Sequence, residues 1–416
     1  MTKLKGAAVF GQSGGPTSVI NASASGVFQQ ALKEDLITEV YGAAHGIRGI
    51  LEEDFYDIRK ETQEELDLLK TTPSSALGSV RYKLKDPSVD DTDYKRILEV
   101  FKKYNIRYFF YNGGNDSMDT TNKISKFLAK SGYECIVMGV PKTIDNDLFG
   151  TDHCPGYASA ARYVATTIME IYHDARVYDT PMITVIEIMG RNAGWLTAAS
   201  VLAAYKGAGP DLIYLPEVPF TMEKFIKDVR KVFDTKGGKV IVAFSEGCKN
   251  SEGKYIAEMG ATLSKDAFGH AQLGGAASVL ADILKNEFKC KVRGIEFSLM
   301  QRCGAHIGSK TDVDEAFMAG QEAVKAAVSG ITDHMVAFER VMVDGKYTCQ
   351  PKLINLSHVA NTEKTVPLEW LNKDQNFLTD DFISYALPLI QGDSHPPYVD
   401  GLPHFAKLKK VSVPKK

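Results

Sequence analysis

The residues best suited to chemistry lie in the loop after residues 135–138, where Lys142, Thr143, Asp145 and Asp147 stand close together. A lysine is a point charge that suits phosphate. An aspartate beside a hydroxyl group can accept its proton, and a second aspartate can hold Mg²⁺ directly or through water. Because Asp, Asn and Thr also satisfy the backbone of turns, a capped turn without a catalytic role is the alternative. We favour a site for an anion, a metal ion and a general base.

Two glycine-rich segments could approach a phosphate. Residues 11–15, Gly-Gln-Ser-Gly-Gly, leave the backbone open to a ligand at the start of a helix. Their spacing matches neither GxGxxG nor GxxxxGK[ST], so a tight strand-to-helix turn is an equal alternative. In residues 113–117, Asp116 could ligate Mg²⁺, while Ser117 could bond phosphate or cap the next helix.

Isolated charges add candidates for substrate binding. Arg81 and Arg191 each follow a glycine-containing segment, and an Arg can bind phosphate with two parallel hydrogen bonds. Glu246 follows another apolar run, and its carboxylate could bind sugar hydroxyls. Taken singly, each of these residues is more often an ordinary surface residue.

Most of these loops follow a short apolar run, and amphipathic stretches lie between the loops. The apolar runs, which predict strands, are residues 7–10, 108–111, 135–138, 183–188 and 240–244. The amphipathic stretches, which predict covering helices, include residues 94–103, 119–131 and 221–233. Strands that alternate with helices form parallel sheets, and ligands bind beyond the carboxyl ends of such strands. We therefore predict an α/β fold of two Rossmann-like domains with mainly parallel sheets and the active site in the cleft between them.

Composition excludes several classes of protein. With 416 residues, 44% of them hydrophobic and 24% charged, the chain is typical of a globular protein of two domains. A net charge of −3 gives no reason to expect a nucleic-acid partner or a membrane surface. The six cysteines show no zinc spacing and predict reduced thiols. The apolar start is too short for a signal peptide, so we expect a cytoplasmic protein.

The domain boundaries are poorly marked because no low-complexity linker is present. We expect residues 1–155, with a return at about 301–350, to bind the phosphoryl donor. Residues 156–300 are expected to bind the sugar phosphate. Residues 351–416 are expected to form an irregular, Pro-rich extension that packs on the core. The lysines near its end, at 407, 409 and 410, predict a solvated tail.

Taken together, these segments resemble the phosphofructokinase family over roughly residues 5–320. The family's motifs occur here in order. They are the glycine loop, Leu77-Gly78-Ser79-x-Arg81, Gly113-Gly114-x-x-Ser117, Thr143-Ile144-Asp145-Asn146-Asp147, Met189-Gly190-Arg191-x-x-Gly194, Glu246 and Gln301-Arg302. The resemblance implies transfer of a phosphoryl group to fructose 6-phosphate, with Mg²⁺ as cofactor, by a homodimer or homotetramer.

The resemblance also implies roles for individual residues. Asp145 would act as the general base that deprotonates the sugar 1-hydroxyl, with Thr143, Lys142 and Arg191 also catalytic, and the metal would rest on Asp116 and Asp147. The donor would be bound by Gly11, Gly14, Gly15, Arg81, Asn115, Asp116, Ser117 and Lys142. The sugar phosphate would be bound by Thr143, Asp145, Asp147, Met189, Gly190, Arg191, Glu246, Arg293 and Arg302. Such catalysis consists mostly of positioning and charge stabilisation.

Two departures from the ATP-using pattern bear on the donor. Asp116 replaces a glycine, and its carboxylate would repel the α-phosphate of a nucleotide. Lys142 replaces the glycine before Thr143 and would favour a short, highly charged donor. The pattern resembles the pyrophosphate-dependent branch of the family, so we expect pyrophosphate as donor. ATP as donor and a non-catalytic sugar-phosphate sensor are the alternatives.

Three further departures leave the acceptor open. Asn115 stands where the family usually has Asp, which changes the expected metal ligands. Leu299 and Met182 replace residues that contact the sugar phosphate in many members. A longer sugar, such as sedoheptulose 7-phosphate, is therefore an alternative acceptor.

Overall fold

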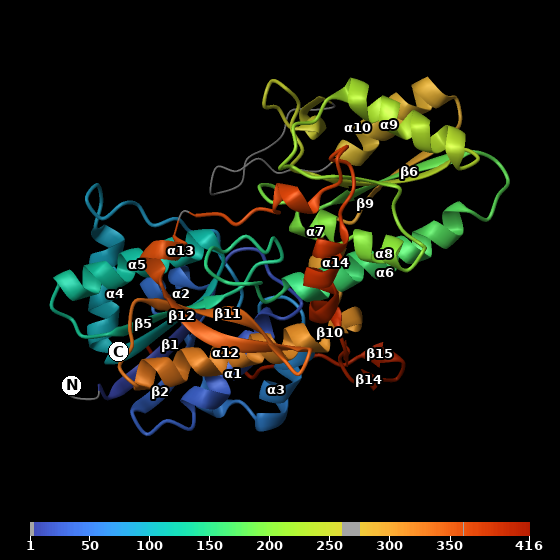
Figure 1. Cartoon of the computed structure of the whole chain (residues 1–416). Coiled ribbons are helices and arrows are strands. Elements are labelled where there is room, and N and C mark those ends of the chain that lie inside the picture. The colour runs from blue at the N-terminus through green and yellow to red at the C-terminus, as the bar shows by residue number, and fades with distance from the viewer. Residues whose placement is uncertain (1–3, 260–274, 361) are drawn as a thin grey trace.

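The computed structural model describes residues 4–259, 275–360 and 362–416. Two larger sheets, each covered by helices, form the two halves of the molecule (Figure 1). Within the described part of the chain, no helix is long and apolar enough to cross a membrane.

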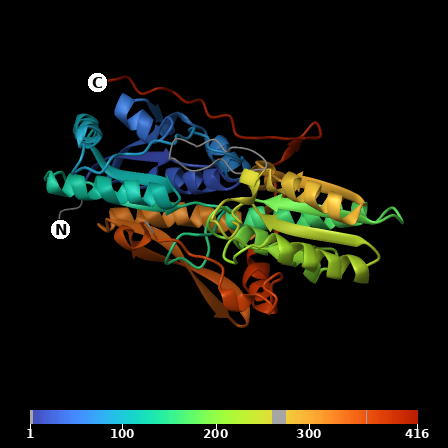
Figure 2. The same cartoon turned by 90° about the horizontal axis from the view of Figure 1, so that it is seen from above.

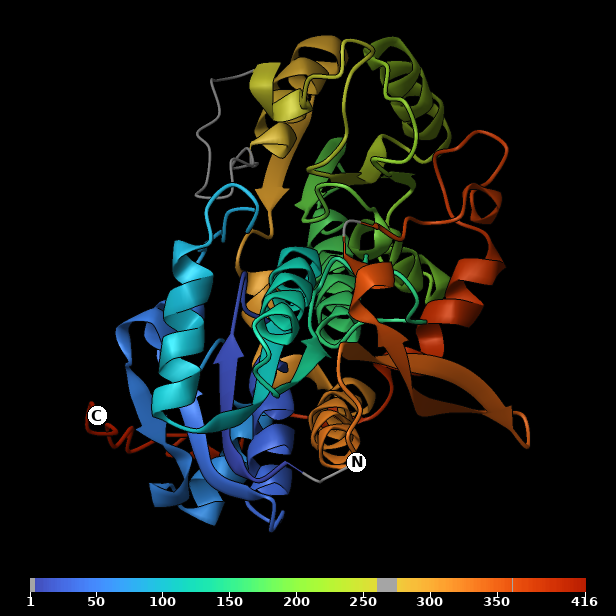
Figure 3. The ribbon, with the colours of Figure 1, turned by 90° about the vertical axis from the view of Figure 1, so that its left-hand side faces the viewer.

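The first sheet has the strand order β12-β11-β5-β4-β1-β2-β3. Its strands are β1 (Gly6–Gln12), β2 (Ile37–Ala43), β3 (Phe55–Asp57), β4 (Ile106–Gly113), β5 (Ile136–Pro141), β11 (His334–Val343) and β12 (Lys346–Asn355). The pairs from β2 to β11 are parallel, and β3 and β12 are antiparallel edge strands. β11 and β12 continue past the body of the sheet as a two-stranded ribbon (Figure 3).

Both faces of the first sheet are covered, which explains why its central strands are continuous apolar runs. Phe10 and Phe110 pack on one face against α1 (Ile20–Ala31) and α12 (Lys310–Val328). Val9 and Phe109 pack on the opposite face against α4 (Thr92–Lys103) and α5 (Asn115–Lys130). The short helices α2 (Ile47–Glu52) and α3 (Gln63–Leu68) complete this half.

The second sheet has the order β7-β8-β6-β9, and all its pairs are parallel. Its strands are β6 (Met182–Ile188), β7 (Leu212–Tyr214), β8 (Lys239–Ser245) and β9 (Lys291–Glu296). One face packs on α6 (Tyr157–Ala175), α7 (Trp195–Ala198) and α8 (Val201–Tyr205). The other face packs on α9 (Met222–Thr235) and α10 (Ala276–Phe288). The strand and helix types predicted from the apolar and amphipathic stretches are confirmed, with ends that differ by a few residues.

The region after residue 351 differs from the irregular extension that we expected. The predicted boundary at 351 lies inside β12, a strand that the sequence pattern does not reveal because it is largely exposed and lacks a continuous apolar run. Two helices follow, α13 (Leu356–Val359) and α14 (Asp380–Ala386), and Trp370 and Phe382 pack on Trp195 in the core of the second half. The division of the chain into functional domains stays a prediction.

The last residues run back along the first half (Figure 2). Asp57 and Val413 form main-chain hydrogen bonds with Val411 and Phe55, so the tail lies along β3. Three short pieces complete the chain: α11 (Met300–Cys303), the strand pair β10 (Gly308–Ser309) and β13 (Asp393–Ser394), and the pair β14 (Tyr398–Val399) and β15 (Leu402–Pro403).

Candidate active site

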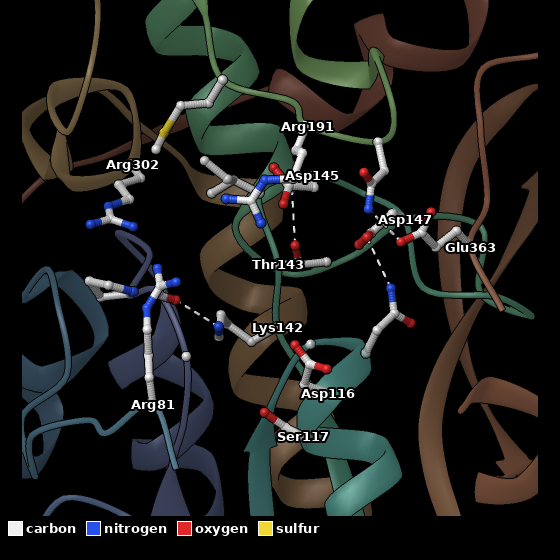
Figure 4. A pocket seen from close by; sticks show the side chains of 18 of the residues that line it. Arg81, Asp116, Ser117, Lys142, Thr143, Asp145, Asp147, Arg191, Arg302 and Glu363 are labelled. Atoms are coloured by element: carbon white, nitrogen blue, oxygen red, sulfur yellow. Dashed lines mark hydrogen bonds between the residues drawn. The ribbon is translucent and has the colours of Figure 1, made fainter. Parts of the chain in front are cut away.

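A pocket of about 550 Å³ lies where the carboxyl ends of β1, β4 and β5 face those of β6 and β8 (Figure 4). The predicted site residues that line it are Gly14, Gly15, Arg81, Asn115, Asp116, Ser117, Lys142, Thr143, Asp145, Asp147, Met189, Arg191, Glu246 and Arg302. These residues come from separate loops of both halves, so the fold brings together what the sequence places up to 288 residues apart, from Gly14 to Arg302.

The loop after β5 carries the two aspartates and is fixed by its own hydrogen bonds. The Thr143 amide donates to the Pro155 carbonyl at 3.1 Å. The Asp145 amide donates to the Thr143 hydroxyl, also at 3.1 Å. Between the aspartates, Asn146 adopts a left-handed backbone conformation with a φ of 56°. The resulting tight turn presents Asp145 and Asp147 to the same pocket (Figure 4).

Burial and neighbouring charges shift the pKa values of both aspartates. Burial raises the pKa of Asp145, while the charges of Arg191 and Lys142 lower it in part. Burial and the negative charges of Asp145 and Glu363 raise the pKa of Asp147. A carboxylate with a raised pKa accepts a proton more readily, which suits a general base. The role of Asp145 as general base stays a prediction, which this environment supports.

Lys142 is buried beside the glycine loop that follows β1. Its ammonium group donates to the Gly15 carbonyl at 2.6 Å, and 4% of the residue is exposed. Burial, together with the positive charges of Arg302 and Arg81, lowers the pKa of Lys142 to about 8 against the opposing charge of Asp145. Three cations therefore gather at one end of the pocket.

Arg302 lies at this cationic end of the pocket, whereas its predicted role is to bind the phosphate of the sugar. A Cβ atom on Gly15 would lie 2.8 Å from a guanidinium nitrogen of Arg302, so Gly15 leaves the space that this side chain fills. Arg302 and Arg81 stand on the same side of the pocket in Figure 4. Binding of the 6-phosphate by Arg302 stays a prediction, and its position also suits a phosphoryl donor.

Asn115, Asp116 and Ser117 form the first turn of α5, whose N-terminus points at the pocket. The side-chain amide of Asn115 donates to the carboxylate of Asp147 at 2.9 Å. A Cβ atom on Gly113 would lie 2.1 Å from the Ser117 hydroxyl, so this close approach requires glycine. The positive end of the helix dipole favours a phosphate here, and Asp116 adds an exposed carboxylate beside it.

The loops of the second half form the opposite end of the pocket. The Gly190 amide donates to Glu246 at 3.3 Å, which connects the loops after β6 and β8. Gly190 has a φ of 143°, and a Cβ atom there would lie 2.6 Å from the Ala193 carbonyl, so only glycine fits. Burial, together with the negative charges of Asp145 and Glu187, raises the pKa of Glu246 to about 7. This end offers a carboxyl group that can donate or accept a hydrogen bond near neutral pH.

Three of the expected binding residues do not line the pocket. Gly11 lies within β1. Gly190 contributes the hydrogen bond that its backbone N–H donates to Glu246. Arg293 lies on β9 and pairs with Asp174 at 2.9 Å. Its predicted contact with a sugar phosphate stays a prediction that a single chain does not fulfil.

Sequence reasoning missed Glu363 and Asn192, which line the pocket. Asn192 donates to Glu363 at 2.7 Å, and a β-bridge joins Glu363 to Leu148 beside the aspartate loop. Asn192 lies inside the Met189–Gly194 motif, so that motif was a usable signal. Glu363 lies in a region without any recognisable motif, and only the fold brings it to the site.

Asp147 and Glu363 lie close together at the right of Figure 4 and line the same pocket as Asp145. The negative charges of Asp145 and Glu363 help to raise the pKa of Asp147, and a bound cation would offset that repulsion. Carboxylate oxygens are the ligands that Mg²⁺ prefers in proteins. Asp116 lines the same pocket from α5.

The chain is similar to known proteins over nearly its whole length. A family model described as Phosphofructokinase matches residues 7–295. A pyrophosphate–fructose 6-phosphate 1-phosphotransferase of Halomonas elongata is 41% identical over 413 residues, which are 98% of this chain and 97% of the relative. A protein of the same name from Xanthomonas campestris is 43% identical over 415 residues, with the same coverage of 98% and 97%. The crystal structure of a pyrophosphate-dependent phosphofructokinase from Nitrosospira multiformis matches with a TM-score of 0.90 and 39% identity, covering 99% of this chain and 98% of that chain.

Proposed function

Because the chain belongs to the phosphofructokinase family, we propose that it transfers a phosphoryl group from pyrophosphate to the 1-hydroxyl of fructose 6-phosphate. The products are fructose 1,6-bisphosphate and phosphate. The reaction is reversible, because pyrophosphate and a phosphate ester lie closer in energy than ATP and the same ester.

In the proposed mechanism the 1-hydroxyl oxygen attacks the terminal phosphorus, the P–O–P bond breaks and phosphate leaves. Asp145 accepts the hydroxyl proton, as its raised pKa allows. The side chains of Thr143 and Arg191 line the pocket beside Asp145 and hold the reacting groups in place. No covalent intermediate with the protein is required, and catalysis consists of positioning and charge stabilisation.

Enzymes of this family generally need a divalent metal ion, and we propose Mg²⁺ for this chain. Asp116, Asp147 and Glu363 are the residues that would hold it, and it would neutralise charge on the phosphoryl oxygens. Asn115 supports this arrangement because its amide fixes one oxygen of Asp147.

The observation that carries the choice of donor is the paired position of Lys142 and Asp116 in the pocket. Lys142 places a buried positive charge where a short, highly charged anion binds. Asp116, at the N-terminus of α5, places a negative charge where the α-phosphate of a nucleotide would lie. Pyrophosphate gains the attraction without meeting the repulsion. The cytoplasmic location, the homodimer or homotetramer and the roles of the single site residues remain predictions.

The test is formation of fructose 1,6-bisphosphate from fructose 6-phosphate and Mg²⁺, with pyrophosphate or ATP supplied in separate reactions. An Asp145→Ser protein purified in the same way controls for contaminating kinases. We expect turnover with pyrophosphate and none with ATP. Turnover with ATP alone would refute the role of Lys142 and Asp116, and no turnover with either donor would refute the proposed reaction.

A further inference from the structure

Asn146, between the two aspartates of the catalytic loop, is fully buried and has both ends of its amide bound. Its side-chain oxygen accepts the Cys154 amide at 2.9 Å, and its side-chain nitrogen donates to the Tyr385 hydroxyl at 2.8 Å. The first bond closes the loop on itself. The second bond connects it to a residue 239 positions away. The two hydrogen bonds of the buried Asn146 side chain therefore fix the turn that presents Asp145 and Asp147.

The side chain of Tyr385 is well fixed for this contact. Tyr385 lies on α14, and its hydroxyl donates to the Asp152 carbonyl at 2.8 Å, at the far end of the same loop. Its ring packs against Trp195 and Trp370, with centroids 5.2 and 5.4 Å away. One hydroxyl group therefore joins the middle of the loop, through Asn146, to its end, through Asp152.

The end of the loop is anchored in turn by charged groups from several elements. Arg340 of β11 donates to both carboxylate oxygens of Asp152, at 3.0 and 3.2 Å. The Lys364 ammonium donates to the Asp152 carbonyl at 2.7 Å. Arg340 also donates to the Tyr385 carbonyl at 3.0 Å. Tyr385 is therefore bound to a segment that several ion pairs and hydrogen bonds hold in place.

His153 completes the anchor. Its ring nitrogens lie 2.8 Å from Asp152 and 2.6 Å from Glu315, and the Tyr347 hydroxyl donates to Glu315 at 2.7 Å. The ligand atoms of His153, Glu315 and Cys349 lie within 4.8 Å of one another, close enough to bracket a metal ion. Because both nitrogens of His153 already face carboxylates, we interpret this cluster as an ion network that holds Asp152.

We propose that Tyr385 is a positioning residue for phosphoryl transfer, acting through Asn146 on the placement of Asp145 and Asp147. The proposal deepens the proposed function and rests on it. It assigns a catalytic task to the region after residue 351, since α14 supplies the group that fixes the catalytic turn. A small displacement of a reacting group is costly in such sites, so loss of this hydroxyl should lower kcat roughly 10- to 100-fold.

The test compares Tyr385→Phe with a matched variant, Tyr133→Phe. Both hydroxyls are buried, with 9% and 8% of the residues exposed, and each bonds to two groups. Tyr133 bonds to the Phe101 and Ile106 carbonyls, away from the pocket. We expect both variants to lower the melting temperature, but only Tyr385→Phe to lower kcat, with KM for both substrates within about twofold.

A double-variant measurement tests whether Tyr385 acts through Asn146. Asn146→Gly keeps the left-handed backbone conformation but removes the amide side chain. If Tyr385 acts through this amide, adding Tyr385→Phe to Asn146→Gly should lower kcat no further. Multiplied losses would overturn the proposed route.

Hydrogen exchange of the loop gives a readout that does not depend on activity. The Cys154 amide, which donates to Asn146, should exchange faster in Tyr385→Phe and at the wild-type rate in Tyr133→Phe. An unchanged kcat and unchanged exchange in Tyr385→Phe, beside an active wild-type enzyme, would overturn the inference alone. An inactive wild-type enzyme would instead refute the proposed function, while the exchange experiment would still decide whether Tyr385 fixes the loop.

Discussion

The proposed donor end and acceptor end of the pocket use the same structural unit, a loop after a parallel strand, but they present different charged groups. At the donor end, burial and the nearby charges of Arg302 and Arg81 lower the pKa of Lys142. At the acceptor end, burial and the negative charges of Asp145 and Glu187 raise the pKa of Glu246. The proposed donor and acceptor ends therefore differ in their charged groups rather than in their fold.

Under the proposed function, this difference in charged groups would determine how each substrate is selected. A cluster of cations around a buried lysine favours the substrate with the highest charge density, which is pyrophosphate. A carboxyl group that titrates near neutrality favours a substrate rich in hydroxyls, because it can donate or accept a hydrogen bond. Donor selectivity should therefore depend on charge, and acceptor selectivity on hydrogen bonding.

The largest effect is expected where the two ends meet, at Asp145. Asp145→Ser removes the proposed base, and general-base catalysis typically contributes about 10²- to 10⁴-fold. We expect kcat to fall by at least that factor, with a smaller change in either KM, in steady-state assays. A variant that kept nearly the full rate would remove Asp145 from the role of base.

Lys142→Gly should damage the donor end alone. Hydrogen bonds to a charged group contribute about 1.5–3 kcal/mol, so kcat/KM for pyrophosphate should fall roughly 10- to 100-fold. The KM for fructose 6-phosphate should stay within about twofold. Lys103→Met, which removes a lysine paired with Glu53 at 2.8 Å on the far side of the first half, should leave both constants unchanged. Equal losses for both substrates would break the comparison between the ends.

The pH profile should show the same asymmetry. Because the pKa of Lys142 is about 8 in the free enzyme, its charge is present below that pH and lost above it. We expect kcat/KM for pyrophosphate to decline above about pH 8, by up to about tenfold per pH unit. Lys142→Gly should lack this additional decline, while the ionisation of pyrophosphate itself affects both proteins. Parallel profiles for the two proteins would contradict the assignment.

Glu246→Gln should damage the acceptor end alone. The amide keeps the size of the side chain but loses its titration, and one neutral hydrogen bond contributes about 0.5–1.5 kcal/mol. The KM for fructose 6-phosphate should therefore rise about 2- to 10-fold, with kcat/KM for pyrophosphate unchanged. Glu287→Gln, on the exposed surface of the same half, provides the control. A larger effect on pyrophosphate than on the sugar would reverse the assignment of the ends.

The smallest effect is expected for Arg293→Ala, because Arg293 pairs with Asp174 outside the pocket. Because this pairing holds Arg293 outside the pocket, we expect Arg293→Ala to change KM for fructose 6-phosphate less than about twofold. Arg302→Ala should measurably weaken binding of fructose 6-phosphate or of pyrophosphate. A strong effect of Arg293→Ala would show that its side chain takes part in binding the sugar phosphate, as the family resemblance implies.

The strands that position the site could be predicted because they are buried on both faces. β1, β4, β5, β6 and β8 read as continuous apolar runs, each followed by a polar loop. β12 could not be predicted, because much of it is exposed and its apolar residues do not form a run. Sequence pattern reports local burial, so it locates the buried strands and leaves the ribbon unassigned.

The candidate site divides in the same way. Lys142, Asp145 and Asp116 stand in motifs whose spacing places them at strand ends. Glu363 and Tyr385 could not be found from spacing, because their contacts with the catalytic loop are long-range. Arg302 was identified as a binding residue, but its position beside Gly15 became visible only in the structure.

The most direct test of the donor assignment is competition between the two donors in one reaction. The enzyme would receive equal amounts of pyrophosphate and ATP with fructose 6-phosphate and Mg²⁺, and ³¹P NMR would follow all phosphorus species together. The account predicts that pyrophosphate disappears, that phosphate and fructose 1,6-bisphosphate form in equal amounts, and that ATP is unchanged. Formation of ADP at a comparable rate would contradict it.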